Sequence, residues 1–233
     1  MALPFFYINE YDPSKKEIDL DEDTSKHIVQ VLRMKEGEQL NLTDGKGSII
    51  TAEITNEHKK HCSVKIIDSR FTSYDPRKIT IAISLLKNTN RFEWFLEKAT
   101  EIGVSEIIPL ISERTEKEKF RFQRMNSICV SAMLQSQQCW LPVLHEPQEF
   151  KQVCERSDQQ QKFIAHCAEG NKTQLTNKQI NEATIILIGP EGDFTKDEIA
   201  LALQNNFTPV SLGETRLRSE TAGVVAASML LVK

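Results

Sequence analysis

The last fifth of the chain contains the same local pattern twice: an apolar strand, a glycine loop and a helix. The first copy is the apolar run Thr184–Ile188, followed by the loop Gly189–Phe194. A short run that is rich in β-branched residues and ends at Gly-Pro is typical of a buried strand. The capping-box spacing from Thr195 to Glu198 predicts that the next helix begins at Thr195.

The second copy consists of a strand over 210–212, the loop Gly213–Arg218 and a helix over 219–232. If both strands belong to one parallel sheet, both loops lie at its carboxyl edge, where α/β proteins bind ligands. Ordinary βα turns are the alternative interpretation. Two adjacent copies favour a ligand site more strongly than one copy would.

The residues of the first loop narrow the class of ligand. The loop matches neither of the glycine motifs that cradle phosphates, GxGxxG and GxxxxGK[ST]. Pro190 removes a backbone donor, and Glu191 and Asp193 place carboxylates where a phosphate site would have none. The loop therefore favours a neutral or cationic ligand and argues against a nucleotide-dependent enzyme.

The chain changes character near residues 73–76. Before this point, short strands near residues 5, 39, 48 and 63 are separated by turn signals, and a short helix fits 24–32, so we expect a small barrel. After it, strands near residues 79, 105, 162, 184 and 209 alternate with helices. That alternation predicts an α/β fold with a parallel sheet.

Composition excludes several classes of protein. The chain has 233 residues, a net charge of −4 and an odd number of cysteines, five. The cysteines lack CxxC spacing, which argues against a disulfide framework and a zinc site and favours a reducing cytoplasm. No apolar stretch reaches membrane-spanning length, and the N-terminus does not resemble a signal peptide. Because the net charge is negative, any contact with RNA is expected to be confined to one face.

The motifs resemble the signature of the ribosomal RNA small-subunit methyltransferase E family. The similar segments are 188–193, 212–213 and 217–222, together with 27–33 and 42–47 near the N-terminus. Members of that family transfer a methyl group from S-adenosylmethionine to N3 of a uridine in 16S ribosomal RNA of the small subunit. The resemblance therefore implies this RNA as the substrate and S-adenosylmethionine as the cofactor. The cofactor carries a sulfonium cation and no phosphate, which agrees with the acidic loop.

The same resemblance implies a knotted, SPOUT-like fold. Residues 1–72 are then expected to form a PUA-like RNA-binding β-barrel, and residues 73–233 a parallel-sheet methyltransferase domain with a C-terminal trefoil knot. Proteins of this superfamily are homodimers, so we expect a homodimer. Periodicity cannot reveal a knot, and general rules of chain threading would argue against one.

The resemblance also implies roles for single residues. Arg218 is the expected catalytic residue, and Arg33, Lys87 and Arg91 are expected to contact RNA. The expected cofactor-binding residues follow three strands: Cys167, Ala168, Ile188, Gly189, Pro190, Glu191, Gly192, Leu212, Gly213 and Leu217. Core packing is the favoured alternative for both His166 and Cys167, and a surface cation at a helix end is the alternative for Arg33.

Arg218 suits the chemistry that this family performs. When uridine N3 loses its proton, negative charge spreads to O2 or O4, and a permanent cation can stabilise it. A structural salt bridge from Arg218 to Glu191 or Glu220 is the alternative interpretation.

The chain departs from the family at 134–138, where it has Leu-Gln-Ser-Gln-Gln and the family usually has Glu-Gln-Ser-Gly-Arg. The family's glutamate and arginine are replaced here by Leu134 and Gln138, so the roles of those two side chains cannot be carried over to this chain. The departure leaves open a second interpretation, a non-catalytic RNA-binding factor of ribosome assembly on the same fold.

Overall fold

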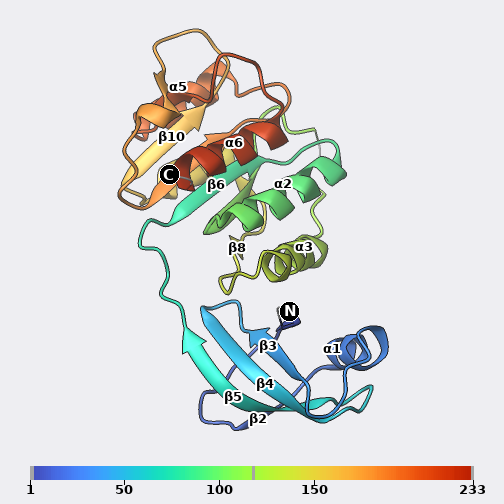
Figure 1. Cartoon of the computed structure of the whole chain (residues 1–233). Coiled ribbons are helices and arrows are strands. Elements are labelled where there is room, and N and C mark those ends of the chain that lie inside the picture. The colour runs from blue at the N-terminus through green and yellow to red at the C-terminus, as the bar shows by residue number, and fades with distance from the viewer. Residues whose placement is uncertain (1–2, 117–118, 232–233) are drawn as a thin grey trace. The chain divides into compact units, whose positions relative to one another are not determined.

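The computed structural model describes residues 3–116 and 119–231 (Figure 1). The chain divides into two compact units. One comprises Met1–Tyr74 and Met133–Leu141, and the other Asp75–Ala132 and Pro142–Lys233. A segment far along the sequence thus belongs to the N-terminal unit, which local patterns did not predict.

The N-terminal unit is a curled five-stranded sheet. β1 pairs in parallel with β3, and the other pairs are antiparallel, in the order β1-β3-β4-β5-β2. The strands are β1 (Phe5–Tyr7), β2 (Glu17–Asp19), β3 (Gln39–Thr43), β4 (Ser48–Asn56) and β5 (Ser63–Phe71). Every second residue in the middle of β4 is buried, namely Ile50, Ala52 and Ile54, as expected when one face of a sheet covers a core.

One short helix was predicted over 24–32, and the structure has two different turns there. α1 (Glu22–Lys26) begins after Asp21, whose side chain accepts a hydrogen bond from Thr24 N–H. A π-helical turn, η1 (His27–Val31), follows directly. Arg33 follows the C-cap of this turn, Leu32, and has a left-handed φ of 57° and an exposed side chain.

The segment Met133–Leu141 contacts the turn between β3 and β4. Leu141 N–H donates to Gly45 O, Gly47 N–H donates to Cys139 O, and the Trp140 indole donates to Thr72 O at 3.0 Å. Gly47 has a φ of 102°, and a Cβ there would lie 2.6 Å from Trp140 Cζ2. Its glycine therefore allows both the turn and the close approach of the tryptophan.

The C-terminal unit is built on a parallel sheet, which confirms the predicted α/β class. The strand order is β11-β13-β10-β12-β6-β7-β8, and β9 also pairs with β7. The strands are β6 (Ile79–Ser84), β7 (Glu106–Ile111), β8 (Val143–Leu144), β9 (Gln148–Glu149), β10 (Gln161–Ala165), β11 (Thr173–Gln174), β12 (Thr184–Ile188) and β13 (Thr208–Ser211). All residues of β6 and β12 are buried, as in strands covered on both faces.

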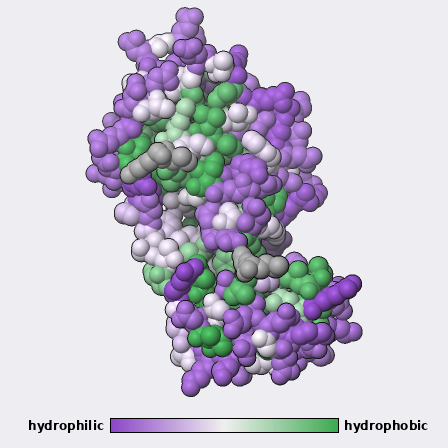
Figure 2. Space-filling model, viewed as in Figure 1, coloured by the Kyte–Doolittle hydropathy of each residue, from purple (hydrophilic) through white to green (hydrophobic). Residues whose placement is uncertain are grey.

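Helices cover this sheet. They are α2 (Thr89–Ile102), α3 (Phe122–Gln135), α4 (Phe150–Arg156), α5 (Lys196–Gln204) and α6 (Ser219–Leu231), with the short η2 (Leu175–Asn177). α5 is capped by Thr195 through the capping box that the sequence predicted. α6 packs against α2 and β6 (Figure 1), while α4 and α5 contact each other. Figure 2 shows hydrophobic residues gathered over α6. None of the described helices is long and apolar enough to cross a membrane.

The strand order brings three loops together. β13 pairs with β10 and not with β12, although it follows β12 in the sequence. After β13 the chain returns to β6 and α2 as α6, and η2, from the connection between β10 and β12, contacts α6. Because β13, β10 and β12 are parallel neighbours, the loops that follow them lie at one edge of the sheet.

Gly223 permits the close packing of α6. A Cβ at this position would lie 2.6 Å from Phe95 Cε2 and 3.1 Å from Ile83 Cδ1. Both neighbours are fully buried and have no free space to move into.

We expect Gly223→Ala to lower the free energy of unfolding by at least about 1 kcal/mol, because overpacking outweighs the gain in helix propensity. Urea unfolding measures the change. Ser228→Ala, at a half-buried position of the same helix, is the control and is expected to change little. Equal stability of Gly223→Ala and the wild type would contradict this packing.

Candidate ligand site at the carboxyl edge of the sheet

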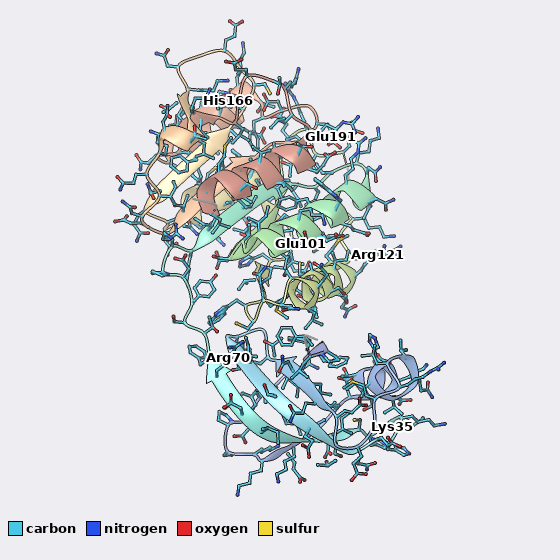
Figure 3. The ribbon with its side chains drawn as sticks, in the orientation of Figure 1. Lys35, Arg70, Glu101, Arg121, His166 and Glu191 are labelled. Atoms are coloured by element: carbon cyan, nitrogen blue, oxygen red, sulfur yellow. The ribbon has the colours of Figure 1, made fainter. Side chains whose placement is uncertain are left out.

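A cavity of about 630 Å³ opens at the carboxyl edge of the parallel sheet. It is lined by the ends of β10, β12 and β13, by residues of the loops that follow them, and by the start of α6. We refer to these loops by residue number, as the 166–172, 189–194 and 213–218 loops. Figure 3 labels His166 and Glu191, which belong to the first two. The volume lies in the range of small-molecule sites in proteins.

Most residues expected to bind a cofactor line this cavity. They are Cys167, Ile188, Gly189, Pro190, Glu191, Leu212, Gly213 and Leu217, and the expected catalytic Arg218 lines it as well. Ala168 and Gly192 lie in the same loops but are not among the lining residues.

Two successive residues of the 189–194 loop are bonded to two other loops. The Glu191 carboxylate accepts a hydrogen bond from Lys87 N–H at 3.3 Å. The Gly192 carbonyl accepts one from Arg114 Nη1 at 2.6 Å. A Cβ on Gly192 would lie 3.2 Å from Arg114 Cδ, so the glycine makes room for the arginine. Gly192 thus faces a supporting side chain and not the cavity.

Asp193 connects the loop to a third neighbour. Its Oδ2 accepts a hydrogen bond from Cys167 N–H at 2.8 Å. The 189–194 loop is therefore held by the turn after β6, by the segment after β7 and by the loop after β10. Hydrogen bonds to charged groups are shorter and stronger than those between neutral groups, so these contacts should rigidify the loop.

The cavity is lined by side chains of both charges. Carboxylates and cations both contribute to the lining, namely Glu191, Asp193, Glu214, Lys172, Arg216 and Arg218. The acidic character inferred from the first loop is therefore balanced by cations from the other two loops. Among the described residues, no group of histidines, cysteines and carboxylates is placed to hold a metal ion.

Arg218 lies exposed just before α6, and its carbonyl accepts Ala222 N–H at 2.7 Å. The two carboxylates named as alternative salt-bridge partners have other contacts. Glu220 is buried, and its Oε1 lies 3.6 Å from Arg91 Nε, while the Glu191 carboxylate accepts Lys87 N–H. Among the described residues no carboxylate forms an ion pair with Arg218, so its guanidinium is available to a ligand.

His166 also lines the cavity, although core packing was the favoured sequence interpretation. Its Nδ1 is buried without a hydrogen-bond partner among the described residues. The pKa of His166 is lowered, first by burial and then by Lys172, while Asp193 opposes the shift. This shift favours the neutral imidazole.

The residues expected to contact RNA do not line the cavity. Lys87 is exposed and pairs with Glu116 at 2.7 Å, which raises the pKa of its ammonium. Arg91 lies on α2 beside Glu220. Arg33 is exposed in the N-terminal unit.

Sequence reasoning placed neither Lys172 nor Arg114 at this site. Lys172 lines the cavity, and its Nζ donates to His166 O and Ala168 O at 2.9 Å. No motif surrounds either residue, so local pattern carried no signal for them. Glu198 of the capping box at Thr195 also accepts a hydrogen bond from Glu113 N–H, which holds the backbone next to Arg114.

Substitution of alanine for Gly189 or Gly192, the two glycines of the 189–194 loop, should change stability by different amounts. A Cβ on Gly189 would lie 3.2 Å from both the backbone nitrogen and the ring of Phe194, which is buried. A Cβ on Gly192 meets only the side chain of Arg114, which is exposed. We expect Gly189→Ala to cost about 1–3 kcal/mol of stability and Gly192→Ala less than about 1 kcal/mol, measured by urea unfolding. The reverse order would contradict the geometry.

Cys167 is the exposed cysteine of this chain, while Cys62, Cys129, Cys139 and Cys154 are buried. Burial raises the pKa of Cys129 to about 11 and that of Cys154 to about 12. We expect Ellman's reagent at pH 8 to modify a single thiol per folded chain rapidly, because only an accessible thiol reacts. The Cys167→Ser variant should lose this fast phase, and its persistence in the variant would refute the assignment.

Comparison with known proteins identifies the family. The sequence model for the RNA methyltransferase domain matches residues 73–231, and that for the RNA methyltransferase PUA domain matches residues 20–67. The ribosomal RNA small subunit methyltransferase E of Rickettsia conorii is 27% identical over 228 residues, which cover 96% of this chain and 93% of that protein.

Two solved structures are similar over nearly their whole length. A probable rRNA methyltransferase from Porphyromonas gingivalis is 38% identical, with 98% of both chains covered and a TM-score of 0.90. The ribosomal RNA small subunit methyltransferase E of Neisseria gonorrhoeae, bound to S-adenosylmethionine, is 29% identical, with 97% of this chain and 96% of that chain covered and a TM-score of 0.88. These matches confirm the resemblance seen in the motifs. The chain belongs to the RNA methyltransferase family that includes the ribosomal RNA small subunit methyltransferase E enzymes.

Proposed function

We propose that this protein transfers a methyl group from S-adenosylmethionine to N3 of a uridine in 16S ribosomal RNA of the small subunit. The observation that carries the proposal is the cavity formed by the three loops, with the unpaired Arg218 on its lining. Family membership and the relatives named above support the reaction class.

The residues of the cavity fit the proposed cofactor. S-adenosylmethionine carries an ammonium, a carboxylate and a sulfonium, and a lining with both carboxylates and cations is complementary to such a ligand. When bound, the cofactor supplies an electrophilic methyl group that leaves a neutral thioether behind. The chain contributes backbone groups of the loops around Gly189 and Gly213, which approach a ligand without an intervening side chain.

Arg218 is the proposed catalytic residue. Its guanidinium is a cation and has no competing carboxylate among the described residues. Placed beside the acceptor base, it would stabilise the negative charge that develops when N3 loses its proton.

We propose further that RNA binding involves the N-terminal PUA-like domain, residues 1–72, the exposed cations Arg33 and Lys87, and the half-buried Arg91. The match to the PUA domain of RNA methyltransferases supports this role. Residues 73–233 would form the methyltransferase domain.

Substituting alanine for the three cations should weaken RNA binding and reduce its dependence on salt, because each phosphate contact releases counterions. Unchanged binding in a salt titration would refute the assignment.

The assembly and topology expected from the family are also proposals. A homodimer is supported by the half-buried Val224, Val225 and Met229 on α6, over which hydrophobic residues gather in Figure 2. A sedimentation coefficient that corresponds to a monomer at micromolar concentration would refute the homodimer.

A trefoil knot is supported by the return of the chain from β13 to α6 and by the contact of α6 with η2. An unknotted backbone trace in a crystal structure would refute the knot.

We propose a cytoplasmic location, because ribosomal RNA is modified where ribosomes are assembled and the buried cysteines suit a reducing compartment. Fractionation of cells that express a tagged chain tests this.

A non-catalytic RNA-binding assembly factor is the second candidate, favoured by the departures at Leu134 and Gln138 from the family pattern. Calorimetric titration with S-adenosylmethionine separates the two, with ATP as the comparison ligand. Binding of the methyl donor supports the enzyme, and binding of neither ligand supports the assembly factor.

We expect Arg218→Ala to retain most of its affinity for S-adenosylmethionine and to lower the single-turnover methylation rate by about 100-fold or more, the usual effect of removing one charge-stabilising group. Arg218→Lys should recover part of the rate because it restores the charge. Lys196→Ala, an exposed cation at the start of α5, is the control. A wild-type rate in Arg218→Ala would show that the guanidinium has no catalytic role.

A further inference from the structure

Asp193 has a backbone conformation that glycine would adopt more easily. Its φ is 64°, in the left-handed region where a side chain is strained. Asp193 Oδ1 accepts a hydrogen bond from the adjacent Phe194 N–H at 2.9 Å, which compensates part of this strain locally. Because glycine would remove the strain altogether, an aspartate here suggests that the carboxylate is used.

The second oxygen of Asp193 acts on another loop. Oδ2 accepts a hydrogen bond from Cys167 N–H at 2.8 Å. Cys167 begins the exposed part of the 166–172 loop, and it lines the cavity. The strands that precede the two loops are paired, with Ala165 opposite Ile188, so the carboxylate bridges neighbouring strand ends.

Lys172 closes the 166–172 loop from its other end. Its ammonium donates to the carbonyls of His166 and Ala168, both at 2.9 Å. Residues 167–171 are exposed, so apolar packing contributes little to the conformation of this loop. Polar contacts hold the loop instead: the Asp193 carboxylate accepts one backbone N–H, and the Lys172 ammonium donates to two carbonyls.

We propose that Asp193 is a positioning residue that holds the 166–172 loop as a preformed wall of the cofactor cavity, with Lys172 bracing the same loop. This inference rests on the proposed function. If the loop is already ordered, less conformational entropy is lost when the cofactor binds. Loss of the Asp193 contact should therefore weaken the affinity for the cofactor.

The first test is calorimetric titration of S-adenosylmethionine into Asp193→Gly and Asp193→Asn. Asp193→Gly relieves the backbone strain and removes the contact, and we expect its dissociation constant to rise about tenfold, equivalent to about 1.4 kcal/mol. Asp193→Asn retains an acceptor oxygen and should bind more tightly than Asp193→Gly. Thermal stability of Asp193→Gly should be unchanged or higher, which a merely structural role would not produce.

Asn206→Gly is the matched control. Asn206 has a φ of 65°, nearly that of Asp193, and follows α5 outside the cavity lining. Its replacement relieves the same kind of strain without touching the loops, and its affinity for the cofactor should equal that of the wild type.

The second test needs no cofactor. Modification of Cys167 by Ellman's reagent should be at least threefold faster in Asp193→Gly than in the wild type, because the loop loses its contact at this residue, and Asn206→Gly should react as the wild type does. Wild-type affinity together with a wild-type thiol rate in Asp193→Gly would overturn the proposal, as would Asp193→Asn binding no better than Asp193→Gly. If the wild type itself does not bind S-adenosylmethionine, the proposed function fails, and the thiol rates alone decide whether Asp193 orders the loop.

Discussion

The structure of the site depends on the hydrogen bonds that hold the 189–194 loop. Glu191, Gly192 and Asp193 are consecutive, and each is bonded to a different neighbouring segment. A glycine-containing loop on the surface would otherwise lose much of its order, because glycine restricts the backbone least. These contacts allow the loop to keep its backbone open toward a ligand and still hold one conformation.

This arrangement changes the interpretation of the acidic residues. From the sequence, Glu191 and Asp193 were expected to disfavour a phosphate and to favour a neutral or cationic ligand. In the structure both carboxylates accept backbone N–H groups from neighbouring loops, and cations from the other loops also line the cavity. The site is therefore better described as a rigid cavity of mixed charge, which suits a ligand that carries charges of both signs.

The position of the cavity follows from the order of the strands. β10 lies between β12 and β13, so the loops after all three meet at one edge. The return of the chain as α6 requires close packing on β6 and α2, which Gly223 allows. Arg218 precedes this helix directly, so the packing of α6 also places the proposed catalytic cation.

The sequence alone predicted most of the longer strands and helices and much of the candidate site. These features are local patterns: the strand and helix periods, the Thr195 capping box and the two glycine loops. They can be recognised in the sequence because hydrogen bonding and side-chain burial over a few residues produce them. Only the tertiary structure decided how Lys172 and Arg114 support the site, why Gly192 is a glycine, and why Met133–Leu141 belongs to the N-terminal unit. These features depend on contacts between different loops and segments, such as the contact of Arg114 with Gly192, 78 residues apart. Such contacts arise from strand order and close packing, which cannot be predicted from the periodicity of a short segment.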